Sequence, residues 1–472
     1  MKHVLTKITL MALLCVTNLQ AQDLDGKWSG IMRIQNTKLT IVFNVRDTNT
    51  GYSATMDSPD QGAYGIPVTH TKFLNPYVVF FIQSANIVYK GDLSGDSIVG
   101  TFKQTGIELP LTLHRLPSEF KFEDTRPQVP DLSDPEKLPY TQEEVTFNNN
   151  SANVQLSGTL TIPKKGSNFP AVILISGSGP QDRNEELMGH KPFMVIADYF
   201  SRNGIAVLRY DDRGFGTSTG EFSTATTADF ATDAAAAVQY LKTRHSINPY
   251  KIGLAGHSEG GIIAPMVAVD NKDVAFIILM AGTGIKGDSI LKMQMRSFSK
   301  EQGTADEEMK VIESINHKLF ELLPTAKDSA QLIAALKQHV KDFTAAHPEI
   351  KIKKEKVNPF ISLIVEQMSN PWMRYFVTYD PAPALKKVKC PVLAINGDKD
   401  VQVPSAINLN AIGNALNEGG NKHYTLKEFA GKNHLFQSCT TGSISEYHEI
   451  KETFSPEVMA FMLDWILKES GR

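Results

Sequence analysis

The sequence predicts two folded units of different class, a small antiparallel β-domain followed by a larger doubly wound α/β domain. Apolar residues alternate with period two from about residue 24 to residue 116. From about residue 143 onward, continuous apolar runs alternate with helical stretches instead. A proline-rich stretch separates the two patterns, and a chain of 472 residues exceeds what one ordinary hydrophobic core fills.

Composition and charge describe a folded globular protein and argue against a nucleic-acid partner. Apolar residues make up 42% of the chain and aromatic residues 8%, which disordered chains do not reach. The 48 Lys and Arg nearly balance the 51 Asp and Glu, for a formal charge of −3, and no long basic run stands out. Three cysteines cannot staple a chain of this length, so its core must stabilise it.

The first segment, residues 1–21, has the layout of a secretory signal peptide. Lys2 and Lys7 form a positive front, residues 8–16 form a short apolar run, and the segment ends at Ala21. This run is too short to span a bilayer. We therefore expect cleavage after Ala21 and a periplasmic or secreted mature protein, with a buried N-terminal helix as the alternative. No other segment approaches membrane-spanning length without charges.

Residues 22–116 are expected to form a small antiparallel β-barrel or β-sandwich. Apolar and polar residues alternate over residues 39–45 and again over 109–113, as in strands with one buried face. Gly, Asn and Asp cluster at residues 49–51 and 91–95, where we expect turns. No titratable constellation is visible in this segment, so a spacer, a dimerisation surface and a ligand-binding accessory are all open for it.

Residues 117–142 are expected to be a linker, because prolines at this density prevent regular helices and strand ladders. The following domain, residues 143–472, shows the alternation of buried strands and helices that is typical of a doubly wound α/β sheet. In such a sheet the catalytic groups lie at the carboxyl ends of the strands. The strand candidates are residues 144–148, 154–162, 171–175, 205–209, 252–255, 274–280, 392–395 and 424–429.

The strongest chemical signal is the Gly-His-Ser-Glu-Gly sequence at residues 256–260, which follows a strand candidate and opens a helical stretch. A tight strand–turn–helix needs glycine where a side chain would clash, and it lifts the serine hydroxyl above the sheet. Ser258 is therefore the candidate nucleophile. The backbone N–H of Glu259 is a candidate oxyanion donor, with a second donor expected from the glycine-rich loop 176–180.

A serine hydroxyl needs a base that takes its proton, and His434 is the candidate because it directly follows the last strand candidate. His257 adjoins the serine, but the turn should direct it away. His448 is the fallback base. His190 and His245 are expected at the surface.

The base needs an acid that holds its tautomer. The strand at residues 392–395 ends in Asn-Gly-Asp-Lys-Asp, which offers Asp398 and Asp400, and the residues alone leave both open. The chain order serine, aspartate, histidine is that of α/β-hydrolases and not that of chymotrypsin or subtilisin folds.

Taken together, these motifs resemble those of bacterial exported α/β-hydrolases of the esterase and serine-aminopeptidase-like kind. The resemblance extends from about residue 143 to residue 470 and implies an α/β-hydrolase fold that acts through a Ser-His-Asp triad. The similar segments are ISGSGPQDRNE (175–185), RYDDRGFGTSTG (209–220), GHSEGG (256–261), INGDKDVQVP (395–404) and AGKNH (430–434).

The resemblance also assigns roles to single residues. In such families the acid lies in a Gly-x-x-Asp-x-x-Val motif, which corresponds to residues 397–403 and favours Asp400 over Asp398. By the same analogy, the backbone N–H of Ser178 is the second oxyanion donor. The sequence departs from many relatives at Ser176, where they carry histidine.

Four residues of the loop after the first buried strand are candidate substrate contacts. Gly177 and Gly179 let the backbone approach a ligand, and Arg183 and Glu185 are expected near the mouth of the site. Arg213 belongs to a turn that is structural in similar folds, with substrate contact as the alternative.

Between two strand candidates, residues from about 283 to 388 are expected to form a helical cap inserted over the active site. Helical patterns occur at residues 309–323, 330–343 and 359–368. In this fold, specificity usually resides in such a cap. Large apolar residues that either line a pocket or form the core of the cap are Met293, Met295, Phe320, Phe360, Met368, Trp372 and Phe376.

Signatures of other chemistries are missing from the sequence. It has no His-Glu-x-x-His, no paired Cys-x-x-Cys and no Gly-x-x-x-x-Gly-Lys-Ser/Thr, so we expect no metal and no cofactor. Cys390 and Cys439 should lie at opposite ends of the sheet, so we expect no disulfide between them. Cys15 follows two leucines and lacks the small residues that usually precede a lipid-anchored cysteine.

The leading functional hypothesis is a serine hydrolase that cleaves carboxylic esters through an acyl-enzyme, with a small acyl ester or short peptide as substrate. The alternative is an exported serine aminopeptidase or acyl-peptidase, in which Glu185 or Glu186 would recognise a free amine. A third possibility is a binding protein on a catalytically inactive hydrolase scaffold. A homodimer is compatible with the sequence. The sequence does not identify the substrate.

Overall fold

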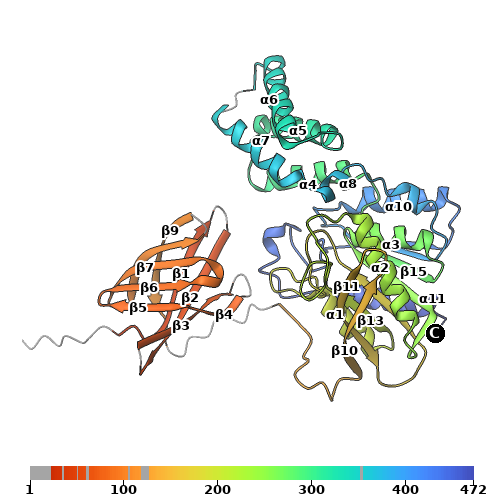
Figure 1. Ribbon diagram of the computed structural model, residues 1–472, viewed down its shortest axis with the longest axis horizontal. Coiled ribbons are helices and arrows are strands. Elements are labelled where there is room, and N and C mark those ends of the chain that lie inside the picture. The colour runs from red at the N-terminus through yellow and green to blue at the C-terminus, as the bar shows by residue number, and fades with distance from the viewer. Residues whose placement is uncertain are drawn as a thin grey trace, which may run out of the picture. The chain divides into compact units, whose positions relative to one another are not determined.

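The computed structural model of the chain divides into two compact units, residues 1–125 and 126–472 (Figure 1). The predicted signal segment lies outside the described residues. The second unit begins earlier than the sequence predicts, because the end of the proline-rich stretch is part of it: Leu138 is buried, and Gln128 N–H donates to the Lys451 carbonyl at 2.7 Å. The described residues are 23–34, 37–49, 51–59, 63–104, 107–117, 127–350 and 354–471.

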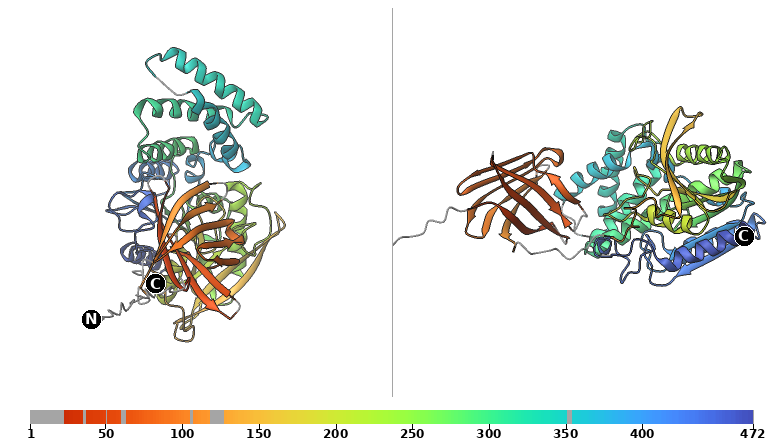
Figure 2. Two further views of the ribbon diagram at one scale, coloured as in Figure 1. Left: turned by 90° about the vertical axis from the view of Figure 1, so that its left-hand side faces the viewer. Right: turned by 90° about the horizontal axis from the view of Figure 1, so that it is seen from below.

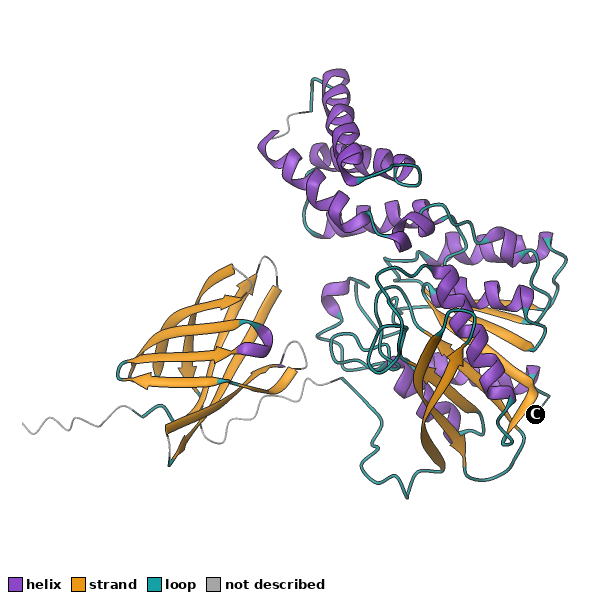
Figure 3. Cartoon of the chain, in the orientation of Figure 1, coloured by secondary structure: helices purple, strands orange, loops and turns teal. Residues whose placement is uncertain are grey.

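Within its described residues, the first unit is one antiparallel sheet of nine strands, curved into a half-barrel (Figure 3). The order across the sheet is β4-β3-β2-β1-β9-β8-β7-β6-β5, which confirms the antiparallel β-domain predicted from the sequence. The strands are β1 (Gly26–Ile34), β2 (Thr37–Thr48), β3 (Gly51–Ser58), β4 (Ala63–Pro67), β5 (His70–Leu74), β6 (Tyr77–Ile82), β7 (Ile87–Ser94), β8 (Ser97–Gln104) and β9 (Ile107–Arg115).

The period-two alternation buries the inner face of this sheet. Phe43 and Phe80 stack there with ring centroids 4.2 Å apart. The turn expected at residues 91–95 is shorter, because β7 continues to Ser94. Gly91 instead lies opposite Gly100 within the ladder, where a Cβ on Gly91 would stand 2.8 Å from a carbonyl oxygen of the neighbouring strand.

The described residues of the second unit contain a mixed sheet of eight strands in the order β10-β11-β13-β12-β14-β15-β16-β17. The first two strands run antiparallel to their neighbours, and the pairs from β13 to β17 are parallel. This is the predicted α/β architecture. The strands are β10 (Tyr140–Asn149), β11 (Val154–Pro163), β12 (Phe169–Ile175), β13 (Ala206–Tyr210), β14 (Ile247–His257), β15 (Val274–Met280), β16 (Val392–Gly397) and β17 (Tyr424–Phe429).

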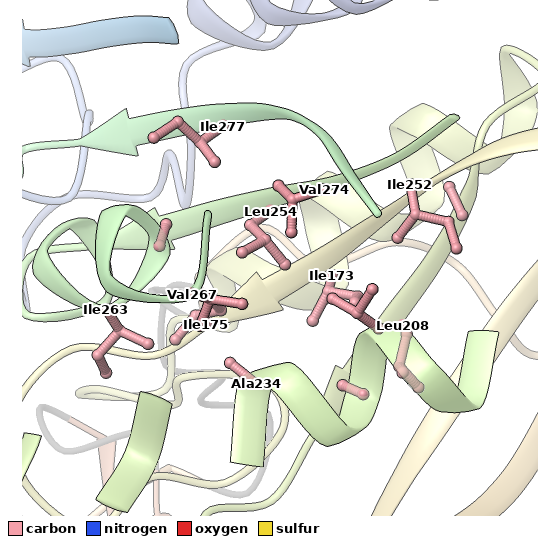
Figure 4. Close-up of a cluster of buried hydrophobic side chains, with 14 of the residues drawn as sticks. Ile173, Ile175, Leu208, Ala234, Ile252, Leu254, Ile263, Val267, Val274 and Ile277 are labelled. Atoms are coloured by element: carbon pink, nitrogen blue, oxygen red, sulfur yellow. The ribbon is translucent and has the colours of Figure 1, made fainter. Parts of the chain in front are cut away.

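Helices cover both faces of this sheet and create two hydrophobic layers. Alternate residues of one strand serve opposite layers: Ile173 packs with Ala234 and Ile263 on one side (Figure 4), and Val172 packs with Phe200 on the other. The strands are therefore apolar on both faces and read as continuous hydrophobic runs. The covering helices are α1 (Pro192–Arg202), α2 (Thr227–Lys242), α3 (Gly260–Asp270), α10 (Ser405–Glu418) and α11 (Pro456–Glu469).

The predicted insertion between β15 and β16 is a group of helices with a core of its own (Figure 2). Leu319, Leu336 and Ile361 are fully or almost fully buried in that core, which also includes Ile262 of α3 and Val403. The cap is therefore packed onto the helix that follows Ser258. Its helices are α4 (Gly287–Glu301), α5 (Asp306–Leu322), α6 (Ser329–Ala346), α7 (Lys354–Met368), α8 (Pro371–Phe376) and α9 (Ala382–Leu385). Among the described residues, none of the helices is both long and apolar enough to cross a membrane.

Candidate active site

Ser258 sits in a strained turn between β14 and α3. Its φ is 53°, which is unusual for a residue with a side chain, and its N–H donates to the Met280 carbonyl at 2.8 Å. The turn needs glycine on both sides: a Cβ on Gly256 would lie 1.9 Å from the Gly260 oxygen, and one on Gly260 would lie 2.2 Å from the Ile175 oxygen. The Gly-x-Ser-x-Gly spacing thus follows from steric closure of the turn.

A buried aspartate and histidine form a hydrogen-bonded pair across two loops. Asp400 Oδ2 lies 2.7 Å from His434 Nδ1, and Asp400 Oδ1 accepts the N–H groups of Gln402 and Val403, each at 2.8 Å. Asp398 is exposed and accepts the N–H of Gly431 instead. Of the two aspartates that the sequence offers, the structure brings Asp400 to His434.

The loop that carries His434 is clamped from within. The fully buried Asn433 side chain accepts the N–H groups of Leu435 and Gln437 at 3.0 and 2.9 Å. At the neighbouring strand end, Gly397 lets this loop approach closely, since a Cβ there would lie 2.1 Å from the Lys432 oxygen. These contacts fix the histidine beside its carboxylate.

The loop after β12 is held by two buried carboxylates. Glu185 Oε1 accepts the N–H of Gly177 at 2.7 Å. Asp212 accepts the Ser176 hydroxyl at 2.8 Å and the N–H of Gln181 at 2.9 Å. Burial raises the pKa of Asp212 to about 8, against the lowering effect of its hydrogen bonds. The Ser176 hydroxyl therefore anchors the loop.

Glu259, which directly follows the serine, connects the turn to the cap through its side chain. Its Oε1 accepts the Thr227 hydroxyl and the indole N–H of Trp372, both at 2.7 Å, and its carboxylate also bonds the Ser178 side chain. Burial raises the pKa of Glu259, while these donors lower it. No sequence signal marks this side chain, because its partners come from three remote segments.

A second histidine–carboxylate pair lies beside the first. His257 Nδ1 is 2.8 Å from Glu185 Oε1, and His257 Nε2 is 2.9 Å from the backbone carbonyl of His434. The two histidine rings lie 4.7 Å apart. The sequence predicts that the turn directs His257 away from the site, and this prediction is wrong. Glu185 and the His434 carbonyl hold both ring nitrogens of His257 at the site.

One cavity of about 210 Å³ brings the candidate residues together. Its polar side is lined by Ser258, His434, Ser178 and Gly177, with His257, Glu185 and Glu259. Of the large cap residues, Trp372 and Phe376 line it and stack with ring centroids 4.9 Å apart. Phe320 is buried in the cap core, and Met295, Phe360 and Met368 pack against that core. Further apolar lining comes from Leu187, Ile262, Ile290, Leu291, Val403 and Leu435.

Several residues singled out in the sequence lie elsewhere. Arg183 does not line the cavity, because its guanidinium pairs with Asp211 at 2.7 Å and with Glu144. Gly179 is also outside the lining; its φ of 94° serves the turn. His190 is fully buried and not at the surface, with Nε2 2.8 Å from a backbone carbonyl.

Three further candidates have structural partners. Arg213 is buried and pairs with Asp233 at 2.7 Å, so it does not face the cavity. Glu186 pairs with Lys191 at 3.2 Å, and His448 also lies outside the cavity lining.

In the described part of the chain, no group of three or more His, Cys, Asp and Glu side chains is placed to hold a metal ion, and Cys390 and Cys439 are free thiols.

Comparison with protein families gives a match that includes all three residues of the candidate triad. A family described as serine aminopeptidase, S33, matches residues 191–437, which is more than half of the chain. The chain belongs to this family. The match confirms the resemblance and the α/β-hydrolase fold expected from the sequence, and it identifies the protein as a member of a hydrolase family.

One curated relative of this S33 family member is an esterase. Esterase EstD of Thermotoga maritima is 30% identical over 197 residues, which are 41% of this chain and 45% of that protein, so the chain matches less than half of that relative's length. Among solved structures, the Pyrococcus furiosus esterase PF2001 is 17% identical with a TM-score of 0.43, over 73% of this chain and 96% of that chain.

Est1E from Butyrivibrio proteoclasticus, solved with ferulic acid bound, is also 17% identical, with a TM-score of 0.40 over 70% of this chain and 100% of that chain. At these identities and TM-scores, the two structural likenesses say nothing about the substrate of this chain.

Proposed function

We propose that this S33 family member is a serine hydrolase that cleaves carboxylic esters through an acyl-enzyme. One observation carries the proposal: Ser258, on its strained turn, shares a cavity with His434, whose Nδ1 is held at 2.7 Å by the buried Asp400. Nucleophile, base and orienting acid are the three parts that ester hydrolysis by serine requires.

The reaction follows from these roles. His434 Nε2 takes the proton of the Ser258 hydroxyl while Oγ attacks the ester carbonyl carbon. Asp400 keeps the other proton of His434 on Nδ1 and stabilises the imidazolium that forms. His434 then protonates the leaving alcohol, and the acyl group stays on Ser258. A water molecule, deprotonated by His434, then attacks the carbonyl carbon of the acyl-enzyme. The bond from that carbon to Ser258 Oγ breaks, His434 returns the proton to Oγ, and the carboxylic acid leaves.

Two backbone N–H groups are assigned to the oxyanion. The N–H of Gly177 is committed to Glu185 Oε1 at 2.7 Å. The next residue, Ser178, and Glu259 both line the cavity, and Glu259 lies at the start of α3, where the helix dipole favours negative charge. In hydrolases of this kind, losing one such donor lowers kcat by about 10² to 10³.

The cavity favours a neutral acyl group over the free amine of an aminopeptidase substrate. An α-ammonium group needs a carboxylate partner. The carboxylates in the cavity lining are those of Glu185 and Glu259. The first is paired with His257, and the second accepts three side-chain donors. Together with the small volume and the apolar cap wall, this supports an ester with a short acyl chain.

Hydrolysis assays test the proposal and separate the alternatives. The wild-type chain and Ser258→Ala are compared on p-nitrophenyl esters of increasing acyl length and on aminoacyl and N-acetyl-aminoacyl p-nitroanilides. We expect the highest kcat/KM on the short esters, and none of this activity in Ser258→Ala. Faster cleavage of the aminoacyl anilides would establish the aminopeptidase, and faster cleavage of the acetylated ones the acyl-peptidase. Equal residual rates in both proteins would rule out the triad.

We also propose that the enzyme is exported after cleavage behind Ala21. The motivation is the charged front and short apolar run of residues 1–21. Intact-mass measurement of the protein recovered from periplasm and medium should give a chain that begins at Gln22. A full-length chain confined to the cytoplasm would contradict export.

A further inference from the structure

The pair formed by His257 and Glu185 has no role in the reaction described above, although it adjoins every part of it. Both residues are buried, with exposed fractions of 6% and 5%. Their contact of 2.8 Å joins the strand that ends at Ser258 to the loop after β12. Glu185 holds an unusual backbone conformation for a residue with a side chain, with φ at 53°.

The contacts of His257 determine its protonation state. Nε2 faces a backbone carbonyl oxygen at 2.9 Å, which accepts and never donates, so Nε2 carries a proton. Nδ1 faces Glu185 Oε1, which already accepts the N–H of Gly177. A proton on Nδ1 satisfies this contact as a charge-assisted hydrogen bond. Both ring nitrogens therefore donate, and the ring is an imidazolium paired with a carboxylate.

Two parts of the proposed catalytic site meet at this ion pair. Through Gly177, it fixes the loop that supplies the oxyanion donor Ser178. Through its Nε2 hydrogen bond, it fixes the backbone of His434. A fixed distance between nucleophile, base and oxyanion donors is what such catalysis depends on.

We propose that His257 is a positioning residue, a buried imidazolium held by Glu185, which aligns the oxyanion loop with His434. The inference rests on the proposed function, because it presumes that His434 is the base.

The surrounding charges agree with this arrangement. Burial by itself lowers the pKa of His257, but the charge and hydrogen bond of Glu185, the His434 carbonyl and the Asp400 carboxylate raise it above its ordinary value overall. His434 faces the ring from the loop after β17. Asp212, the neighbouring buried carboxylate, interacts electrostatically with Glu185. The cation thus lies among carboxylates that offset its burial.

The kinetics of His257→Gln test the positioning role. In His257→Gln the side-chain amide can still donate to the His434 carbonyl, but the cation is gone. We expect kcat on short p-nitrophenyl esters to fall by about tenfold or more while KM changes little, because the oxyanion loop is no longer held in line with His434. Glu186→Gln, the matched control, removes the adjacent carboxylate, which pairs with Lys191 outside the cavity lining, and should leave kcat unchanged.

A kcat of His257→Gln equal to that of the wild type would overturn the proposal. Because a folding defect would also lower kcat, a second measurement uses the protein that is folded but inactive. Ser258→Ala labelled with ¹⁵N-histidine should show one histidine with both nitrogens protonated at pH 8, and its signals should vanish in Ser258→Ala/His257→Gln. A neutral ring for His257 at pH 8 would refute the inference.

The two hypotheses fail in different experiments. If Ser258→Ala still hydrolyses esters, the proposed function is wrong whatever the charge of His257. If Ser258→Ala is inactive and the nitrogen signals show a neutral His257, the proposed function stands and the present inference falls.

Discussion

Replacing Asp400 by asparagine should remove most of the hydrolysis and preserve the fold. Asp400 Oδ1 accepts the N–H groups of Gln402 and Val403, and Oδ2 contacts His434 Nδ1. Asparagine keeps both backbone bonds only when its amide oxygen takes the Oδ1 position. Its NH₂ group then faces Nδ1, so the ring proton must move to Nε2. His434 in that tautomer cannot take the proton of Ser258.

The magnitude follows from this wrong tautomer. In other serine triads the same change lowers kcat by about 10⁴, which corresponds to about 5.5 kcal/mol at the transition state. We expect a loss of about 10³ to 10⁴ in kcat on p-nitrophenyl acetate, with an unchanged circular dichroism spectrum.

Asp398→Asn is the matched control. Asp398 is exposed and accepts the N–H of Gly431, and an amide oxygen can replace it there, so kcat should stay within about twofold of wild type. The reasoning is refuted if Asp400→Asn keeps more than a tenth of the wild-type kcat or if Asp398→Asn loses as much as Asp400→Asn does.

Three changes outside the triad test the cap, a buried ion pair and a buried histidine. Trp372→Phe deletes the indole N–H that donates to the buried Glu259 carboxylate at 2.7 Å, so kcat/KM on esters should fall by about tenfold or more. The control Trp465→Phe, in the core of the α/β unit, should leave kcat/KM unchanged. Equal kinetics of the two variants would contradict the role of the cap contact. Arg213→Met leaves the buried Asp233 carboxylate without its cation and should lower the free energy of unfolding in urea by about 3 to 5 kcal/mol. The double variant Arg213→Met/Asp233→Leu should restore most of this loss. An unchanged urea midpoint of unfolding in Arg213→Met would contradict a stabilising role of the pair. Burial lowers the pKa of His190 below its ordinary value of 6.5, so the unfolded chain binds a proton more readily than the folded one. The free energy of unfolding should therefore fall as the pH drops through and below 6.5. His190→Gln should reduce this pH dependence between pH 5 and 8, and an unchanged dependence in the variant would refute the assignment to His190.

The parts of the site that the sequence predicted are those encoded by short local geometry. The turn around Ser258 closes only with glycine at both flanking positions, so its spacing is visible in the chain. Asp400 and His434 each follow a strand directly, and parallel strands deliver their carboxyl ends to one edge of the sheet. The fold could be predicted for a similar reason, since strands buried on both faces are continuous apolar runs.

The parts that the sequence did not predict depend on partners from remote segments. Arg183 lies in the loop that the sequence predicts near the mouth of the site, but the sequence does not reveal that Asp211 pairs with its guanidinium in the fold. Glu185 lines the cavity, as expected from the sequence, but its carboxylate is paired with His257, which the sequence does not show. His190 is buried because a backbone carbonyl far along the chain accepts its ring N–H.

The end of the predicted linker illustrates the same limit. The described residues 127–139 contain no helix or strand, as proline density predicts, but β10 already begins at Tyr140 within the predicted linker. The prolines also do not reveal docking. Gln128 bonds the backbone of Lys451, more than three hundred residues away in the chain. Such a contact has no periodic pattern that a sequence could display.

Active-site labelling with a fluorophosphonate, followed by peptide mass spectrometry, tests the central claim most directly. The account predicts a single phosphonyl adduct on the peptide that contains Ser258, and no adduct in Ser258→Ala. Equal labelling of Ser258→Ala, or an adduct on another residue of the wild-type chain, would contradict it.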